Sequence, residues 1–385
     1  MVGQRHPAEA AEITRRLSVP DQEGSPLLQQ VASCADVLSA EGFTFLPSWD
    51  DILGGARPPP FDPQEPPEPG EWRHGWQFYA ASARDNFFRT RTLFPGVSRS
   101  CQALLRSQSG PNSGVVFSTP PTSPLSSMDP APFRVLLLRR LRLPLPPTSR
   151  LCSCRHFLDP LGDHRSACGV SGVLARRGFP PEAAAARVCR EAGARVATNV
   201  LLRDLNIPLP PRDARRVEVI ANNLPLWNGA QLAVDVTLVS PLRRDGLPIP
   251  RAHHTDGVAA ARASRRKATT YPELDGGYSA RLVTLALEVG GRWGPDAARF
   301  IHLLARAKAR SCPPLLRRSA QLAYQRRWAA ILSFAAQRAY ALSLLELPMT
   351  AAGCLDGNPP FMADVLVDDR WSTAAVPSGM PLPGP

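Results

Sequence analysis

The sequence predicts an α/β (α+β) fold in which a small mixed sheet is flanked by helices. A hydrophobic fraction of 44% is enough to bury a core. Short β-rich runs bounded by proline and glycine alternate with segments that carry apolar residues at helical spacing. The order helix-strand-strand-helix-strand-helix-helix between residues 181 and 345 favours helices packed on one sheet.

Each predicted element begins or ends at a residue that prefers that position. The first helix, 181–193, starts with proline and ends with glycine, as helix termini do. Pro241 ends the central strand. The strands are predicted over 216–221, 232–240 and 282–290, and the later helices over 256–267, 295–310 and 314–345.

The 42 prolines divide the chain into regions of different character. Residues 1–70 and 346–385 are Pro-rich and predicted to be mostly disordered. Residues 71–150 are predicted to form a helical basic region, 151–169 a Cys/His-rich metal-binding segment, and 170–345 the α/β domain.

The net charge of +12 and the pI of about 10.0 favour polyanionic partners, nucleic acid before acidic membrane. Only two of the 45 basic residues are lysines, Lys267 and Lys308. An alternative is that GC-rich codons enrich arginine, alanine and proline. No apolar signal region or run of about 18 apolar residues is present, which predicts a non-secreted, non-membrane protein with free or metal-bound cysteines.

Four side chains of zinc-compatible type stand close together: Cys152, Cys154, His164 and Cys168. Three thiolates and an imidazole complete a tetrahedral structural Zn2+ site, which would fold a segment too short for its own core. The first pair is Cys-x-Cys, tighter than the usual Cys-x2-Cys, and His156 is a spare candidate ligand. The alternative is a group of free cysteines and surface histidines.

Three acidic residues, Glu218, Asp235 and Glu288, stand inside three predicted strands. A carboxylate between valines in a strand is costly unless it is paired or bound to a metal. If the three converge, they bind Mg2+ or Mn2+ for phosphodiester cleavage, and Lys267 stabilises the charge on the phosphate. The alternative is that strand alternation turns these acids into water.

Several short patterns occur in the order of a known family. They are Gly162-Asp-His-Arg-Ser-Ala-Cys168, Ala233-Val-Asp-Val-Thr-Leu-Val-Ser-Pro241, Lys267-x3-Tyr271 and Glu288-Val-Gly-Gly-Arg-Trp293. The chain resembles, over roughly residues 72–345, the C-terminal part of reverse-transcriptase polyproteins of non-LTR retrotransposons, of the dinoflagellate and wider protist type. The resemblance implies a zinc knuckle at 151–169 and a restriction-like endonuclease domain of the PD-(D/E)xK superfamily at 170–345.

The resemblance also implies roles for individual residues. Cys152, Cys154, His164 and Cys168 fall on the knuckle ligands. Asp235 falls on the metal-binding acid of the central strand, Glu218 on a position that usually carries aspartate, and Lys267 on a helix that carries a displaced catalytic lysine.

Glu288 and Trp293 match the later strand and its Gly-Gly turn, and Glu191 is a possible fourth acid. Position 237 is threonine, so the strand lysine is absent, and no aromatic-x-Asp-Asp signature of a polymerase occurs.

The predicted function is therefore a metal-dependent DNA endonuclease module, in a truncated copy of such an element. The alternatives are a catalytically dead nucleic-acid-binding remnant and an expressed relic with no function. DNA, and possibly element RNA, are the expected partners; a membrane and a small-molecule substrate are not. A DNA substrate implies a nuclear location.

Overall fold

The computed structural model describes residues 26–43, 46, 76–110, 112–146, 151–170, 172–205, 207, 209–274, 280–349, 362 and 365. Most of the predicted disordered segments, 1–70 and 346–385, lies outside the described residues. The chain divides into two units, Met1–Ser98 and Arg99–Pro385. This division falls inside the predicted 71–150 region, so that the helices after Ser98 belong to the second unit.

The first unit contains helices α3 (Pro26–Ala40) and α5 (Trp76–Phe88), and α5 continues into the π-helical turn η2 (Arg89–Leu93). Helix α3 lies within the segment expected to be mostly without regular structure. It begins at Pro26, a residue whose fixed φ suits a first helical turn.

The second unit holds the sheet and the remaining helices. Its helices are α6 (Arg99–Ser107), α7 (Val115–Ser118), α8 (Pro130–Arg140), α9 (Asp163–Ala167), α10 (Val173–Arg176), α11 (Phe179–Ala192), α12 (Val258–Thr270), α13 (Pro295–Ala309) and α14 (Arg317–Leu345). Its strands are β1 (Arg195–Leu201), β2 (Arg216–Asn222), β3 (Gln231–Val239) and β4 (Ala280–Glu288). Short 3-10 turns lie at Leu202–Leu205, Trp227–Gly229, Pro272–Leu274 and Pro314–Leu316.

The four strands form one mixed sheet in the order β1-β2-β3-β4. β1 pairs antiparallel with β2, β2 antiparallel with β3, and β3 parallel with β4 through the crossover helix α12. The prediction of a mixed α/β fold with a small sheet flanked by helices is confirmed. β1 was not predicted from the sequence, because this exposed edge strand carries no apolar alternation: Arg195, Ala197, Thr198 and Asn199 are all exposed.

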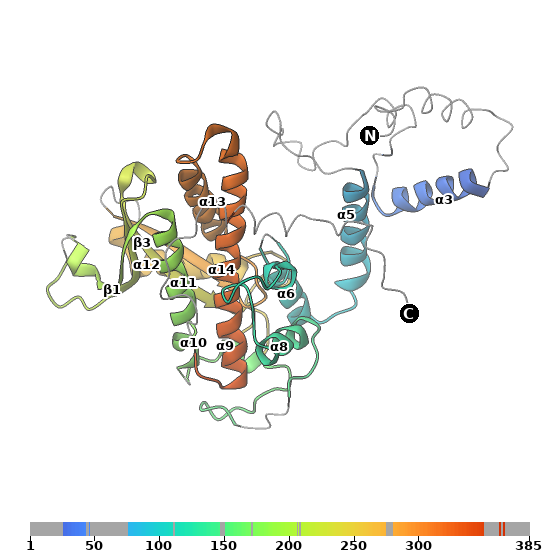
Figure 1. Ribbon diagram of the computed structural model, residues 1–385. Coiled ribbons are helices and arrows are strands. Elements are labelled where there is room, and N and C mark those ends of the chain that lie inside the picture. The colour runs from blue at the N-terminus through green and yellow to red at the C-terminus, as the bar shows by residue number, and fades with distance from the viewer. Residues whose placement is uncertain are drawn as a thin grey trace, which may run out of the picture. The chain divides into compact units, whose positions relative to one another are not determined.

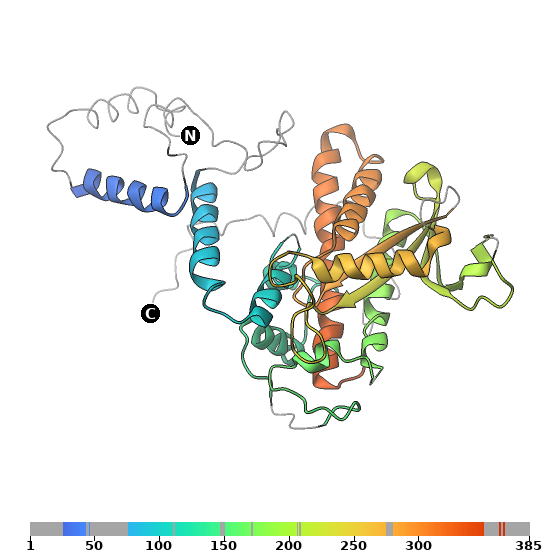
Figure 2. The ribbon, with the colours of Figure 1, turned by 180° about the vertical axis from the view of Figure 1, so that it is seen from behind.

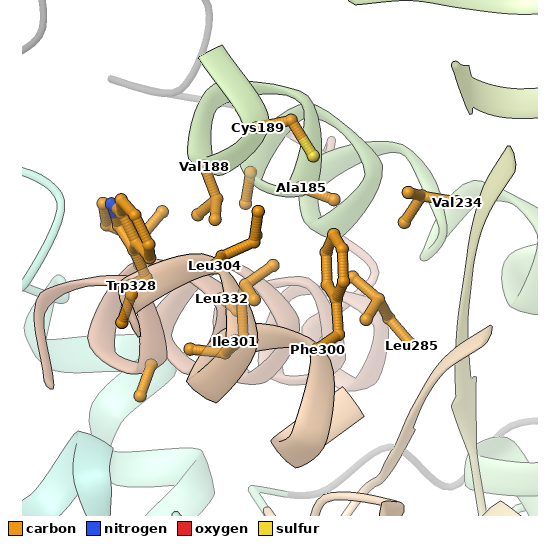
Figure 3. Packing of buried hydrophobic residues seen from close by; sticks show 14 of the residues in the cluster. Ala185, Val188, Cys189, Val234, Leu285, Phe300, Ile301, Leu304, Trp328 and Leu332 are labelled. Carbon is orange, nitrogen blue, oxygen red and sulfur yellow. The ribbon is translucent and has the colours of Figure 1, made fainter. Parts of the chain in front are cut away.

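Helices cover both faces of the sheet. α11 and α13 pack on one face with α14 packed on these two helices (Figure 1), and α12 crosses the other face (Figure 2). Figure 3 shows the apolar core between these helices and the sheet. Phe300 and Leu304 of α13 and Trp328 of α14 belong to the same cluster as side chains of α11 and as Val234 and Leu285 of the sheet. Burying this set against one sheet face is the main apolar contribution to stability.

α14 is the longest helix, with 29 residues, and its buried side chains run from Ala320 to Leu344. It therefore serves as the central support of the second unit, against which α8, α9, α11 and α13 all pack. Length does not make it a membrane element: none of the helices in the described part of the chain is both long and apolar enough to cross a bilayer.

Helix α12 approaches its face of the sheet closely because small residues line the contact. Ala260 and Ala263 pack on Ala286 of β4, and all three are at most 3% exposed. Lys267 follows Ala263 by four residues and therefore lies on the same face of the helix. The alanine contact thus turns Lys267 toward the sheet.

Candidate active site and metal centre

Asp235 and Glu218 face α12 from neighbouring strands and meet Lys267 there. Nζ of Lys267 lies 2.6 Å from Oδ1 and 2.7 Å from Oδ2 of Asp235, and 3.6 Å from Oε1 of Glu218. Oε2 of Glu218 accepts a 2.6 Å hydrogen bond from the backbone N–H of Val236. Asp235 is fully buried (0% exposed), so strand alternation does not turn it into water.

Burial and mutual repulsion disturb the protonation of this group. Burial, with the charge of Asp235 in second place, raises the pKa of Glu218 to about 8. Burial likewise raises the pKa of Asp235. For Lys267, burial lowers the pKa, but the charges of Asp235 and Glu218 outweigh it and the net pKa is raised. The lysine is thus a fixed ammonium between carboxylates that it does not fully neutralise.

A third carboxylate, Glu182 in the first turn of α11, belongs to the same electrostatic group. Burial raises its pKa, the charge of Asp235 raises it further, and Lys267 lowers it. Glu182 was not predicted as a site residue, because it lies 53 positions before Asp235 and feels its charge only through the packing of α11 on the sheet. Its place just after a Pro-Pro pair at a helix start gave no sign of this role.

Glu288 does not join this group. In the parallel register Asp235 pairs with Thr284, and Glu288 pairs with Val239, four residues farther along. Four residues of strand span about 13 Å. Oε1 of Glu288 instead accepts 3.1 Å hydrogen bonds from the backbone N–H groups of Ala259 and Ala260, at the start of α12. Its negative charge stabilises the positive end of the helix that carries Lys267.

Glu191, considered as a fourth acid, lies elsewhere and is already saturated. Its carboxylate accepts hydrogen bonds from Arg187 (3.0 Å), Arg327 (3.0 Å) and the indole N–H of Trp328 (2.9 Å). It is 3% exposed and ties α11 to α14. Trp293 is likewise structural, since it is buried and donates to Ser333 Oγ at 3.2 Å.

The four predicted zinc ligands come together in space. One ligand atom from each of Cys152, Cys154, His164 and Cys168 lies within 4.8 Å of all the others. Sγ of Cys152 is 3.8 Å from Sγ of Cys168, and Sγ of Cys154 is 3.2 Å from Nε2 of His164. Ligand atoms of a tetrahedral zinc site with Zn–S bonds of about 2.3 Å lie about 3.8 Å apart. This Cys3His cluster can hold a metal ion such as zinc.

The tight Cys-x-Cys spacing is accommodated by a turn with left-handed backbone. Arg155 adopts φ 67°, and the backbone N–H of Cys152 donates to the carbonyl of His156 at 2.8 Å. The backbone N–H of His156 donates to the Cys154 thiol and, with the neighbouring thiols, lowers its pKa to about 6, whereas burial raises the pKa of Cys168. The spare candidate, His156, is exposed and outside the four-ligand set.

Neither of the comparisons with known proteins identifies the chain: no protein-family model matches it, and no curated protein matches it significantly. The geometry of the described residues therefore carries the functional argument.

Proposed function

We propose that this chain is a divalent-metal-dependent DNA endonuclease of the restriction-like PD-(D/E)xK type, joined to a zinc knuckle and related to the C-terminal part of non-LTR retrotransposon polyproteins. The observation that carries the proposal is the group formed by the buried Asp235 with the half-buried Glu218, Glu182 and Lys267. Asp235 and Glu218 share one ammonium and Glu182 is a third acid that feels the charges of Asp235 and Lys267, so the group needs a further cation or protons to be neutral.

The donor set fits Mg2+ or Mn2+. The acids offer hard oxygen ligands, and both oxygens of the buried Asp235 carboxylate already face a cation, the ammonium of Lys267. Asp235 and Glu218 would hold the ion on adjacent strands. A bound ion would supply a polarised water and stabilise charge on the scissile phosphate.

The chain's own residues would do the rest of the chemistry. The Val236 N–H fixes the orientation of the Glu218 carboxylate through Oε2, which leaves Oε1 toward Lys267. Lys267, held protonated by its neighbours, donates to the developing negative charge on the phosphate oxygen or the leaving oxygen.

Support for DNA as the substrate comes from α12. Arg262, Arg265 and Arg266 are exposed on this helix, which carries no acid, and none of the three has an acidic partner among the described residues. The charge of Arg266 lowers the pKa of Asp235, which means that this row of arginines extends close to the acidic group. Guanidinium groups bind phosphates in a bidentate manner, which would lay a phosphate backbone across the site.

The test is nicking of supercoiled plasmid by the full chain with Mg2+ or Mn2+, against EDTA. Asp235→Ala removes a buried ligand, and nicking should fall to background. Asp204→Ala is the matched control, because this aspartate is 58% exposed and should leave nicking unchanged. Unchanged nicking by folded Asp235→Ala protein would refute the proposed active site.

A second candidate, a catalytically dead protein that only binds nucleic acid, is favoured by the glutamate at position 218. Glutamate is one methylene longer than the usual aspartate and alters the reach of a metal ligand. Plasmid binding that survives in Asp235→Ala, with no metal-dependent nicking by the parent chain, would select this second candidate.

A further inference from the structure

The Cys3His cluster has one firmly held half. Helix α9, which carries His164 and ends just before Cys168, is anchored on two longer helices. Asp163 pairs with Arg139 of α8 at 2.8 Å, and Ser166 Oγ lies 2.7 Å from the hydroxyl of Tyr340 on α14. The other half, the turn at 151–157, is bounded by exposed side chains. A bound ion would therefore join this turn to a part of the molecule that is already fixed.

His164 links the cluster to a second segment. Its Nε2 faces the thiols, and its Nδ1 lies 2.7 Å from the backbone carbonyl oxygen of Arg244. A carbonyl only accepts, so this hydrogen bond requires the proton on Nδ1. A metal on Nε2 enforces that tautomer and strengthens the Nδ1–H donor. Without the ion, the neutral ring can carry its proton on Nε2, which leaves two lone pairs facing each other.

Arg244 belongs to the loop 240–257, which connects β3, with Asp235, to α12, with Lys267. The loop turns back on itself through the bridge between Leu242 and Pro248. Ser100 Oγ donates to the carbonyl of Gly246 at 2.8 Å. Near α12, Asp256 pairs at 2.8 Å with both Arg106 and Arg292. The loop is thus held by side chains at Gly246 and Asp256, and by the imidazole of a metal ligand at Arg244.

We propose that a metal ion in the Cys3His cluster positions the loop 240–257 through His164, and thereby steadies the start of α12 and the placement of Lys267 against Asp235. His164 is then a positioning residue for the active site as well as a metal ligand. The effect on catalysis rests on the proposed nuclease function, whereas the coupling of the ion to the loop does not.

The coupling is tested by amide hydrogen exchange of the full chain, loaded with zinc or stripped of it by a zinc chelator. The backbone N–H groups of Arg243 and Ile249, bonded to the carbonyls of Leu247 and Pro241, report on the loop. We expect exchange at these amides to become about tenfold faster without zinc, because the hydrogen bond from His164 to the Arg244 carbonyl no longer holds the loop. Amides of α13 should not change. Equal loop exchange in both states would overturn the proposal.

His164→Cys separates metal binding from positioning. Four thiolates still form a tetrahedral zinc site, but the thiolate has no group that can donate to Arg244. We expect one bound zinc per chain and loop exchange as fast as in stripped protein. Cys34→Ser is the control, because Cys34 is exposed and outside the cluster, and its loop should match the parent chain. Parent-like loop protection in zinc-loaded His164→Cys would contradict the proposal. If removal of zinc also speeds amide exchange in α13, the whole second unit has opened. The comparison of zinc-loaded His164→Cys with the zinc-loaded parent chain then tests the proposal.

Nicking kinetics give a second readout. Loss of positioning lowers kcat about tenfold or more in zinc-loaded His164→Cys and leaves KM for DNA unchanged. A cluster that instead contacts DNA directly would raise KM without changing loop exchange, which would overturn the proposal. If no form of the chain cleaves DNA, the nuclease proposal fails, and hydrogen exchange still decides whether the ion holds the loop.

Discussion

At the scale of single residues, hydrogen-bond and ion-pair partners distinguish the acidic positions that the sequence left equivalent. Asp235, Glu218 and Glu288 all stand in strands with apolar neighbours. Asp235 and Glu218 share the ammonium of Lys267, whereas Glu288 accepts two backbone N–H groups of α12. The partner of each carboxylate, and not its spacing in the sequence, decides its role.

The raised pKa of Glu218 predicts a pH dependence of Mg2+ binding. Below about pH 8 the metal-free protein holds a proton on Glu218, which a bound cation must displace. Affinity for Mg2+ should therefore rise with pH up to about 8 and then level off. Isothermal titration calorimetry in buffers of different ionisation enthalpy should detect proton release near pH 7.

Glu218→Gln is the control for this prediction, since the amide has no proton to release in that range. Its Mg2+ binding should be weaker and almost independent of pH between 6 and 8. Proton release that persists in Glu218→Gln would assign the titration to another group.

At the scale of elements, α12 decides whether the site assembles. The helix lies close to β4 because Ala260 and Ala263 meet Ala286, and its positive end is covered by the Glu288 carboxylate. Both features act on the helix as a rigid body, so that a small shift at Ala263 moves Lys267, one turn later, by a similar amount.

Ala263→Leu should therefore displace α12 from the sheet. Overpacking of this kind costs about 1–3 kcal/mol of unfolding free energy. Nicking should fall far more than stability, because the ion pair between Lys267 and Asp235 breaks first. Urea unfolding and plasmid nicking, measured on the same preparations, check both statements.

Ala261→Leu provides the comparison on the same helix. Ala261 is exposed, so that leucine there should change the unfolding free energy by less than about 0.5 kcal/mol and leave nicking intact. Equal loss of nicking in both variants would mean that the helix surface, and not its distance from the sheet, matters.

At the scale of the whole molecule, the sequence predicted the mixed sheet and the helices that flank it, because proline and glycine mark their ends. It also predicted the Cys3His set, because its four ligands lie close together in the chain. β1 was not predicted, because an exposed edge strand needs no apolar alternation. The role of Glu182 and the hydrogen bond from His164 to Arg244 could not be predicted, because both depend on packing between distant segments. Glu182 lies 53 residues before Asp235, and His164 lies 80 residues before Arg244.

The net charge predicts a steep salt dependence of DNA binding. Each phosphate that the protein neutralises contributes about −0.9 to the slope of log K against log salt concentration. Replacement of Arg262, Arg265 and Arg266 by glutamine should make that slope shallower by about one for each arginine that binds a phosphate. Fluorescence anisotropy with a labelled duplex at several salt concentrations measures it.

The same measurement on Asp235→Ala separates binding from cleavage. This variant should keep the parent slope, because Asp235 is buried and binds no phosphate. A slope that is unchanged by the triple arginine replacement would place the DNA-binding surface elsewhere on the chain.

The scarcity of lysine makes the ion pair at Asp235 chemically addressable. Lys267 and Lys308 are the only two ε-amines in the sequence, and the raised pKa of Lys267 keeps it protonated and unreactive toward acylating reagents. An amine-reactive dye should therefore modify Lys308 first among the side chains. When a divalent ion takes over part of the charge of Asp235 and Glu218, Lys267 loses some of that protection. Mass-spectrometric footprinting of these two amines would then report the occupancy of the acidic site without any substrate.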